Sequence, residues 1–189
     1  IEKGGVAGNI GQATNAAANL VFGTGRLLYT GSTASTDRNF TINNGTTITI
    51  DISNSGTNMS MSGASTSTSG SMIKAGNGSL TMSGASGYTG STTISAGAMI
   101  AGANVAVSTN GPLGNAASAI VLGNSSTAAN NSSPSLLTGG AFTVSRTITV
   151  ANQATTGKYS VGGNTDNNST FSGLISFSQP FTIAQVFTS

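Results

Sequence analysis

The chain has no cysteine and no histidine, and only 5% of its 189 residues are charged. Without cysteine there is no disulfide framework, which a small secreted domain with a limited core commonly uses. Stability must therefore come from another source, and stacked repeats that bury one another are one such source. Without histidine, the side chain that most often serves general acid–base catalysis near neutral pH is missing.

The few charges are scattered singly along the sequence and give a net charge of +2. Binding to nucleic acid requires Lys and Arg clustered along one face, so no nucleic-acid partner is predicted. Asp37 and Arg38 are an adjacent acid–base pair, and we expect a corner ion pair or solvated residues rather than a catalytic pair. The acids are Glu2, Asp37, Asp51 and Asp166, and the bases are Lys3, Arg26, Arg38, Lys74, Arg146 and Lys158.

Long hydrophobic runs are also missing. None approaches the roughly 18 apolar residues that a membrane-spanning helix needs. We therefore expect a chain that is soluble or anchored by segments outside it. It begins with Ile1, so we expect one β-solenoid segment over 1–189 that is part of a longer exported protein or of a repeating fibre.

What the sequence does contain is alternation of apolar and polar residues. Residues 47–52 are TITIDI, residues 79–83 are SLTMS, and residues 142–150 repeat the pattern. A period of two predicts strands with one buried face. The alternative is a disordered Ser/Thr/Gly tract, which 65–71 and 125–135 resemble when taken alone. The alternation favours order.

The predicted strands are short and separated by Gly, Asn or Ser-Gly, and residues 15–20 allow at most one helical turn. They are predicted at 20–22, 26–30, 39–42, 46–52, 58–62, 71–74, 79–83, 91–95, 98–101, 104–107, 119–122, 135–138, 141–144, 147–150, 158–161, 169–177 and 180–187.

Short phrases recur at intervals of roughly 20–30 residues, which is typical of solenoids. The chain contains NMSMSGAS, SLTMSGAS and STFSGLIS. In a parallel β-helix the apolar residues stack inward, Ser, Thr and Asn face outward, and Gly and Asn make the corners. At about 20–25 residues a turn, this predicts roughly eight turns and a rod of about 40 Å.

One stretch resembles a known family. Residues 76–102, GNGSLTMSGASGYTGSTTISAGAMIAG, resemble the autotransporter-associated β-strand repeat. Met82 and Ser86 depart from the residues usual in the repeat and keep the polarity of their sites. The matching positions are Lys74, Gly76, Gly78, Leu80, Ser83, Gly84, Tyr88, Thr89, Gly90, Thr92, Ile94, Gly97 and Met99. The flanks at 25–42, 135–150 and 161–175 are similar to regions that accompany this repeat.

The resemblance implies an all-β fold, a right-handed parallel β-helix, in a large bacterial surface protein. Such repeats form the passenger stalk of proteins exported through an outer-membrane translocator. The resemblance thus implies a location on the outer cell surface or outside the bacterium.

Candidate sites are few, and we expect no catalytic residue, no cofactor and no bound metal. The nearest to a metal site is Asp166 with the amides of 164–168, whose oxygens are of the type that Ca²⁺ accepts. A single carboxylate ligand is too few to favour a calcium site, so this segment is predicted to be a polar loop. Tyr29, Tyr88 and Tyr159 are predicted to cap the core at bends with their hydroxyls in water; the alternative is that they are platforms for sugars.

Two functions follow. The first is a non-enzymatic structural protein, a stalk, coat or filament subunit whose open ends join neighbouring copies. The second is an adhesin segment that binds glycans or host surfaces. An enzymatic role ranks last, because acids from neighbouring turns would have to meet in one cleft.

Overall fold

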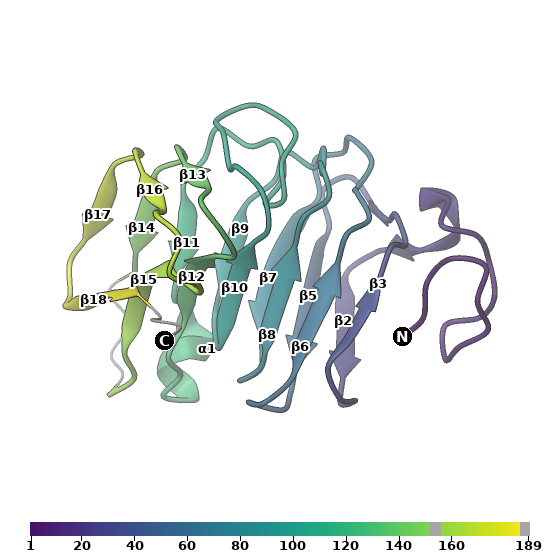
Figure 1. The fold of residues 1–189 in the computed structure, drawn as a ribbon, viewed down its shortest axis with the longest axis horizontal. Coiled ribbons are helices and arrows are strands. Elements are labelled where there is room, and N and C mark those ends of the chain that lie inside the picture. The colour runs from purple at the N-terminus through teal and green to yellow at the C-terminus, as the bar shows by residue number, and fades with distance from the viewer. Residues whose placement is uncertain (152–155, 186–189) are drawn as a thin grey trace.

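The chain is a short rod of coiled β-strands in a computed structural model that describes residues 1–151 and 156–185 (Figure 1). Two seven-stranded parallel sheets form its sides. Two-stranded sheets pair β1 with β4 and β13 with β16. The chain passes from one large sheet to the other and back, so each turn contributes one strand to each. The predicted parallel β-helix is confirmed, with seven strands in each large sheet rather than eight turns.

The first large sheet has the order β17-β14-β11-β9-β7-β5-β2, and the second has the order β18-β15-β12-β10-β8-β6-β3. We call them sheet B and sheet C. Sheet B comprises β2 (Gly25–Tyr29), β5 (Thr47–Ile52), β7 (Ser71–Ala75), β9 (Thr92–Ile94), β11 (Ile120–Leu122), β14 (Ile148–Val150) and β17 (Ile175–Phe177). Sheet C comprises β3 (Ala34–Thr36), β6 (Asn58–Met61), β8 (Ser79–Met82), β10 (Ala98–Ala101), β12 (Ser135–Thr138), β15 (Tyr159–Gly163) and β18 (Phe181–Gln185).

The smaller elements are β1 (Val21–Phe22), β4 (Thr41–Ile42), β13 (Thr143–Val144), β16 (Thr170–Phe171), the 3₁₀ turn η1 (Ala17–Asn19) and the helix α1 (Ser125–Ala129). The single helical turn predicted within 15–20 is confirmed by η1. Strand β3 escaped prediction because AST carries no apolar alternation. The strand predicted at 169–177 is two strands, β16 and β17, because the chain turns between them.

The core is built from ladders of equivalent residues one turn apart. In sheet C, Met59, Leu80, Met99, Leu136 and Val161 are aligned by the parallel register, and all are buried. Residues between them face outward, which is why the sequence alternates. Each strand therefore buries its apolar face against the turns before and after it, and no disulfide is needed.

Two insertions interrupt this regular path. The longer connection at 102–119 joins β10 to β11, and the predicted strand at 104–107 is wrong, since only Val105 forms a bridge there, to Val144. Helix α1 is inserted between β11 and β12. It starts at Asn124, whose side chain accepts the Thr127 N–H, while Thr127 accepts the Asn124 N–H. This reciprocal cap orders a segment whose composition resembles disorder.

The two ends of the rod differ. Residues 1–19 lie over the end that begins with β2 and β3, and β17 and β18 form the other end (Figure 1). At that second end Leu174, Phe177 and Ile183 are 71%, 59% and 80% exposed. The strand predicted at 180–187 is seen as β18 as far as Gln185, and its last two residues lie outside the described residues. One end of the rod is thus covered and the other presents apolar side chains.

Candidate functional site

Lys74 points into the core of the rod rather than into solvent. It stands in the inward ladder of sheet B between Ile50 and Ile94, and it is fully buried. Its Nζ donates to the carbonyl oxygens of Ala75, Gly76 and Ala96 at 2.7, 2.9 and 3.0 Å. Burial lowers the pKa of Lys74 to about 8, against the smaller opposing effect of the nearby Asp51 carboxylate. The ammonium thus binds the corner of its own turn to the corner of the next.

Arg38 has the same kind of environment at the covered end. It is 1% exposed, and its guanidinium donates to the carbonyl oxygens of Glu2, Lys3 and Gly11. The neighbouring Asp37 accepts the Gly4 N–H at 2.8 Å. The expectation of a corner ion pair or solvated residues is wrong for this pair: both side chains hold the N-terminal segment through its backbone.

Arg146 has the same kind of environment as Lys74 and Arg38. It is fully buried, and it donates to the carbonyl oxygens of Leu113 and Ser118 in the 102–119 connection. Burial lowers the pKa of Arg146, and the charge of a Tyr88 phenolate would oppose this. Arg38 and Arg146 therefore fasten two irregular segments to the solenoid, and Lys74 joins the corners of two successive turns. Sequence reasoning missed this role because the partners are backbone atoms, which leave no trace in the sequence.

Tyr88 and Tyr159 belong to the core, and Tyr29 is half-buried and packs against it. Tyr88 and Tyr159 are 0% and 2% exposed, and burial raises the pKa of Tyr88 to about 12. The hydroxyl of Tyr88 bonds Thr92 Oγ1 at 2.9 Å, and that of Tyr29 donates to the Ser32 carbonyl. The prediction that the rings cover the core is confirmed, whereas water contact of the Tyr88 and Tyr159 hydroxyls is wrong. Buried rings exclude a sugar platform at these two positions.

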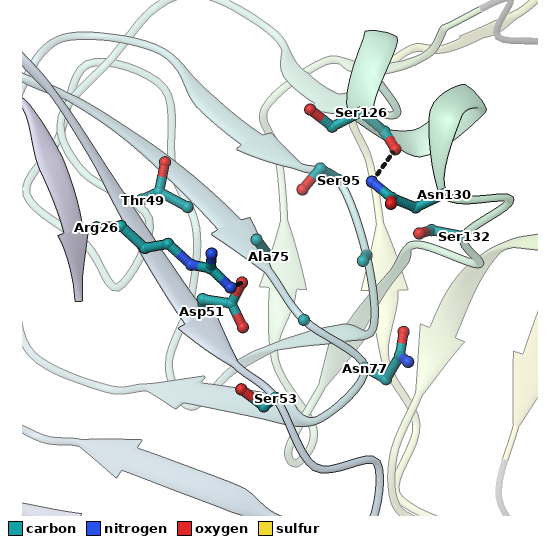
Figure 2. A pocket seen from close by; sticks show the side chains of 12 residues that line it. Arg26, Thr49, Asp51, Ser53, Ala75, Asn77, Ser95, Ser126, Asn130 and Ser132 are labelled. Atoms are coloured by element: carbon teal, nitrogen blue, oxygen red, sulfur yellow. Dashed lines mark hydrogen bonds and ion pairs between the residues drawn. The ribbon is translucent and has the colours of Figure 1, made fainter. Parts of the chain in front are cut away.

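A polar groove of about 630 Å³ lies on the outer face of sheet B. On one side Arg26 of β2 pairs with Asp51 of β5, with 2.6 Å between Nη2 and Oδ2. On the other side α1 and the residues after it present Ser126 and Asn130 (Figure 2). The remaining lining residues are Thr49, Ser53, Ala75, Gly76, Asn77, Ser95, Ala96 and Ser132. None of these described lining residues is aromatic.

The wall formed by α1 is fixed in place. Thr127 is fully buried, and its hydroxyl donates to the Ser95 carbonyl at 2.8 Å, which ties the helix to the turn below it. Asn130 closes the helix by donating to the Ser126 carbonyl at 2.9 Å (Figure 2). The groove is therefore preformed. Nothing in the sequence predicts it, because β2, β5 and α1 are far apart along the chain.

The chain is similar to known proteins over part of its length. The family model described as passenger-associated-transport-repeat matches residues 72–100. The chain contains a passenger-associated-transport repeat. The adhesin BmaC autotransporter of Brucella suis biovar 1 (strain 1330) is 36% identical to the chain over 88 residues, 47% of this chain. The chain spans 2% of that relative's length. No solved structure matches the chain.

The passenger-associated-transport repeat corresponds to two strands of each large sheet. Residues 72–100 take in β7 and β9 of sheet B and β8 and β10 of sheet C. Lys74 and Tyr88 both lie within it, so the repeat includes the buried ammonium and its carbonyl ligands. The resemblance predicted from the sequence is confirmed at these residues.

Outside the passenger-associated-transport repeat, Asp166 lies exposed on the loop after β15. Gln185 Nε2 donates to the Thr165 and Asn167 carbonyls on either side of it. Within 1–151 and 156–185, no three His, Cys, Asp or Glu side chains are grouped as metal ligands. The prediction of a polar loop, and its alternative of a calcium site, are not tested by the structure. No helix in the same ranges is long and apolar enough to cross a bilayer.

Proposed function

We propose that this chain is a rigid, non-enzymatic spacer within the passenger of a longer exported protein on the outer surface of a bacterium. The observation that carries the proposal is the unbroken parallel register of sheets B and C from β2 and β3 to β17 and β18. Each turn adds one strand spacing of about 4.8 Å, so the rod sets a fixed distance between whatever lies at its ends. The passenger-associated-transport repeat supports the surface location.

The placement of the charged side chains supports a role without catalysis. Asp37 is engaged by the N-terminal backbone, Asp51 pairs with Arg26, and Asp166 lies exposed on its own loop. The three buried cations are bonded to carbonyl oxygens. General acid–base catalysis needs a titratable side chain that is positioned to exchange a proton with the substrate. The paired and buried charged side chains of the chain hold its segments together.

The test removes one complete turn from the full-length protein that contains this chain. Deleting 72–91 joins Ser71 to Thr92. Met72 and Thr92 are register partners in sheet B, so Thr92 takes the place of Met72 in the shortened chain. Ser71 and Ser91 are equivalent by the bond between the Ser91 N–H and Ser71 Oγ, at a separation of 20 residues. A spacer should remain folded and displayed on the cell, with the rod shortened by about 4.8 Å.

The matched control is deletion of 72–81, which removes half a turn. It places a corner where sheet B needs a strand, so we expect loss of folding and of surface display. Cell-surface labelling and electron microscopy of the purified passenger give the readouts. If both deletions are displayed equally, regular stacking does not matter and the proposal of a spacer fails.

The second candidate function is adhesion by this segment itself. Two observations favour it: a relative that matches 47% of the chain is named an adhesin, and the α1 insertion builds a groove on an otherwise regular face. Replacing 25–151 by an unrelated solenoid of equal length distinguishes the two candidates. Cell adhesion that survives the exchange supports the spacer, and adhesion that disappears while display persists supports the adhesin segment.

Self-association is a further part of the proposal, with a restriction set by the ends. Within the described residues β17 and β18 are the last strands of the two large sheets, and their backbone groups can pair with a further strand, either of the longer protein or of a second copy. The opposite end is covered by residues 1–19. Stacking end to end into filaments would therefore require the N-terminal segment to leave, or a second copy to join through the β17–β18 end alone.

A further inference from the structure

The groove between α1 and the Arg26–Asp51 pair is more positively charged than its lining residues alone indicate. Asp51 is 7% exposed and faces the groove, while Arg26 has a side chain that is 57% exposed. Beneath the floor lies Lys74, whose Nζ is bonded to the carbonyls of three groove-lining residues, Ala75, Gly76 and Ala96. Two cations therefore act on the groove against one carboxylate.

Arg26 still has unused donors. Its Nη2 bonds Asp51, and within the described part of the chain its other guanidinium N–H groups have no hydrogen-bond partner. A planar guanidinium with free N–H groups binds a carboxylate with two parallel hydrogen bonds. The floor is occupied by small residues, so a ligand can approach the pair.

The rest of the groove offers hydroxyl and amide groups. Ser53, Asn77, Ser126 and Asn130 come from three different turns of the solenoid, and α1 is held rigidly by Thr127. None of the 12 residues drawn in Figure 2 is aromatic, so recognition rests on hydrogen bonds rather than ring stacking. Such a set of groups matches the several hydroxyls of a sugar ring, and a volume of about 630 Å³ is in the range of small-molecule sites.

We infer that this groove binds a saccharide bearing a carboxylate, with the carboxylate on Arg26 and the sugar hydroxyls on the serine and asparagine side chains. The inference rests on the second proposed function, because it assigns a site and a ligand class to adhesion. Asp51 bonds only Nη2 of Arg26, and its charge repels the ligand's own carboxylate, so Asp51 opposes binding. A neutral sugar would meet the same hydroxyl partners without the guanidinium contact.

The experiment titrates the folded chain with tri-galacturonic acid and, in parallel, with uncharged galactotriose, followed by calorimetry or NMR. We expect the acid to bind at least about tenfold more tightly, since a charge-assisted hydrogen bond contributes about that factor. The preference should shrink as salt increases, because the guanidinium is partly exposed. Equal binding of both sugars, or no binding of either up to about 10 mM, overturns the inference.

Three variants locate the site. Arg26→Gln should abolish the preference, whereas Lys158→Gln removes the same charge from an exposed residue outside the groove and should leave it intact. Asp51→Asn should tighten binding of the acid severalfold, because it removes the carboxylate that repels the ligand. A preference that survives Arg26→Gln, or weaker binding with a folded Asp51→Asn, contradicts the assignment. If Asp51→Asn does not fold, the Arg26 and Lys158 pair decides. Failure here leaves the spacer test by turn deletion unaffected.

Discussion

The ammonium of Lys74 lies 3.0 Å from the carbonyl oxygen of Ala96, which belongs to the next turn of the solenoid. The same Nζ bonds two carbonyls in its own turn, so one side chain links two successive corners. Backbone bonds also join successive turns at this corner, such as those from the Ser95 N–H to the Lys74 carbonyl and from the Ala98 N–H to the Gly78 carbonyl. Lys74 adds a charged donor to this corner, bonded to carbonyls of both turns.

Replacing Lys74 by Met should destabilise the chain. Methionine fills a similar volume, but the carbonyl of the buried Ala96 and those of the half-buried Ala75 and Gly76 lose their donor, and a buried unsatisfied group costs about 1–3 kcal/mol. Removal of a buried charge offsets part of this loss. We expect a fall in the free energy of unfolding of about 2 kcal/mol, measured by denaturant titration. Lys158→Met at an exposed site should change it by less than about 0.5 kcal/mol, and an equal effect of both would refute the role of the carbonyls.

The stability of the folded chain should depend on pH through the same group. The pKa of Lys74 is about 8 when folded, against 10.5 when unfolded, so between these values the unfolded chain binds one more proton. The free energy of unfolding therefore rises with pH from about 8 to 10. Tyr88 acts in the opposite direction, because its pKa of about 12 lies above its ordinary 10.0 and its contribution is lost from pH 10 upward. Denaturation midpoints from pH 7 to 12 should pass through a maximum, and the rise should be missing in Lys74→Met.

Arg38→Gln should release the N-terminal segment from the end of the rod. The carbonyls of Glu2, Lys3 and Gly11 lose a common charged donor, and hydrogen bonds to charged groups contribute about 1.5–3 kcal/mol each. We expect cleavage within residues 1–15 by a non-specific protease to become at least about tenfold faster, while the solenoid stays intact. Arg26→Gln is the control, since Arg26 does not contact this segment. Unchanged cleavage of Arg38→Gln would show that the segment is held by other contacts.

Gly76→Ala should be costly at the corner between β7 and β8. Gly76 has φ +73°, and a Cβ there would lie 2.3 Å from the Ile52 carbonyl oxygen of the turn below. The left-handed conformation alone costs about 1–2 kcal/mol, and the close contact adds to it. Gly56→Ala is a matched control in the equivalent corner of that earlier turn, where a Cβ meets nothing within 4 Å. Thermal unfolding should separate the two variants by several degrees, and equal melting temperatures would contradict the stacking of the corners.

Removing residues 1–19 should change how the chain associates. With the first turn uncovered, both ends expose strand edges, so we expect longer particles in electron microscopy as concentration rises. The intact chain should give short particles, monomers or pairs. Adding Phe177→Lys and Ile183→Lys to the truncated chain should prevent the growth, because charge on an edge strand opposes pairing. Filaments of the intact chain would show that the N-terminal segment does not protect its end.

The sequence by itself determined that this chain is a solenoid. The alternation in TITIDI and SLTM marks one buried face per strand, and the recurrence of such strands requires stacking, because a single turn cannot bury its own apolar face. Both patterns are local and have a fixed period, so they can be recognised in the sequence without knowing which residues pack together. Boundaries of strands such as 98–101 and 135–138 followed directly.

Only the tertiary structure decided which contacts the charged side chains make and where the groove forms. Arg38, Lys74 and Arg146 look like isolated surface charges in the sequence, and all are buried with at least one bond to a backbone carbonyl more than 20 residues away. A carbonyl is present at every residue, so no pattern reveals which one an ammonium or guanidinium will reach. The groove also depends on the tertiary structure, since the regular pairing of β2 with β5 brings Arg26 to Asp51, and the inserted helix α1 returns to the same face of the rod.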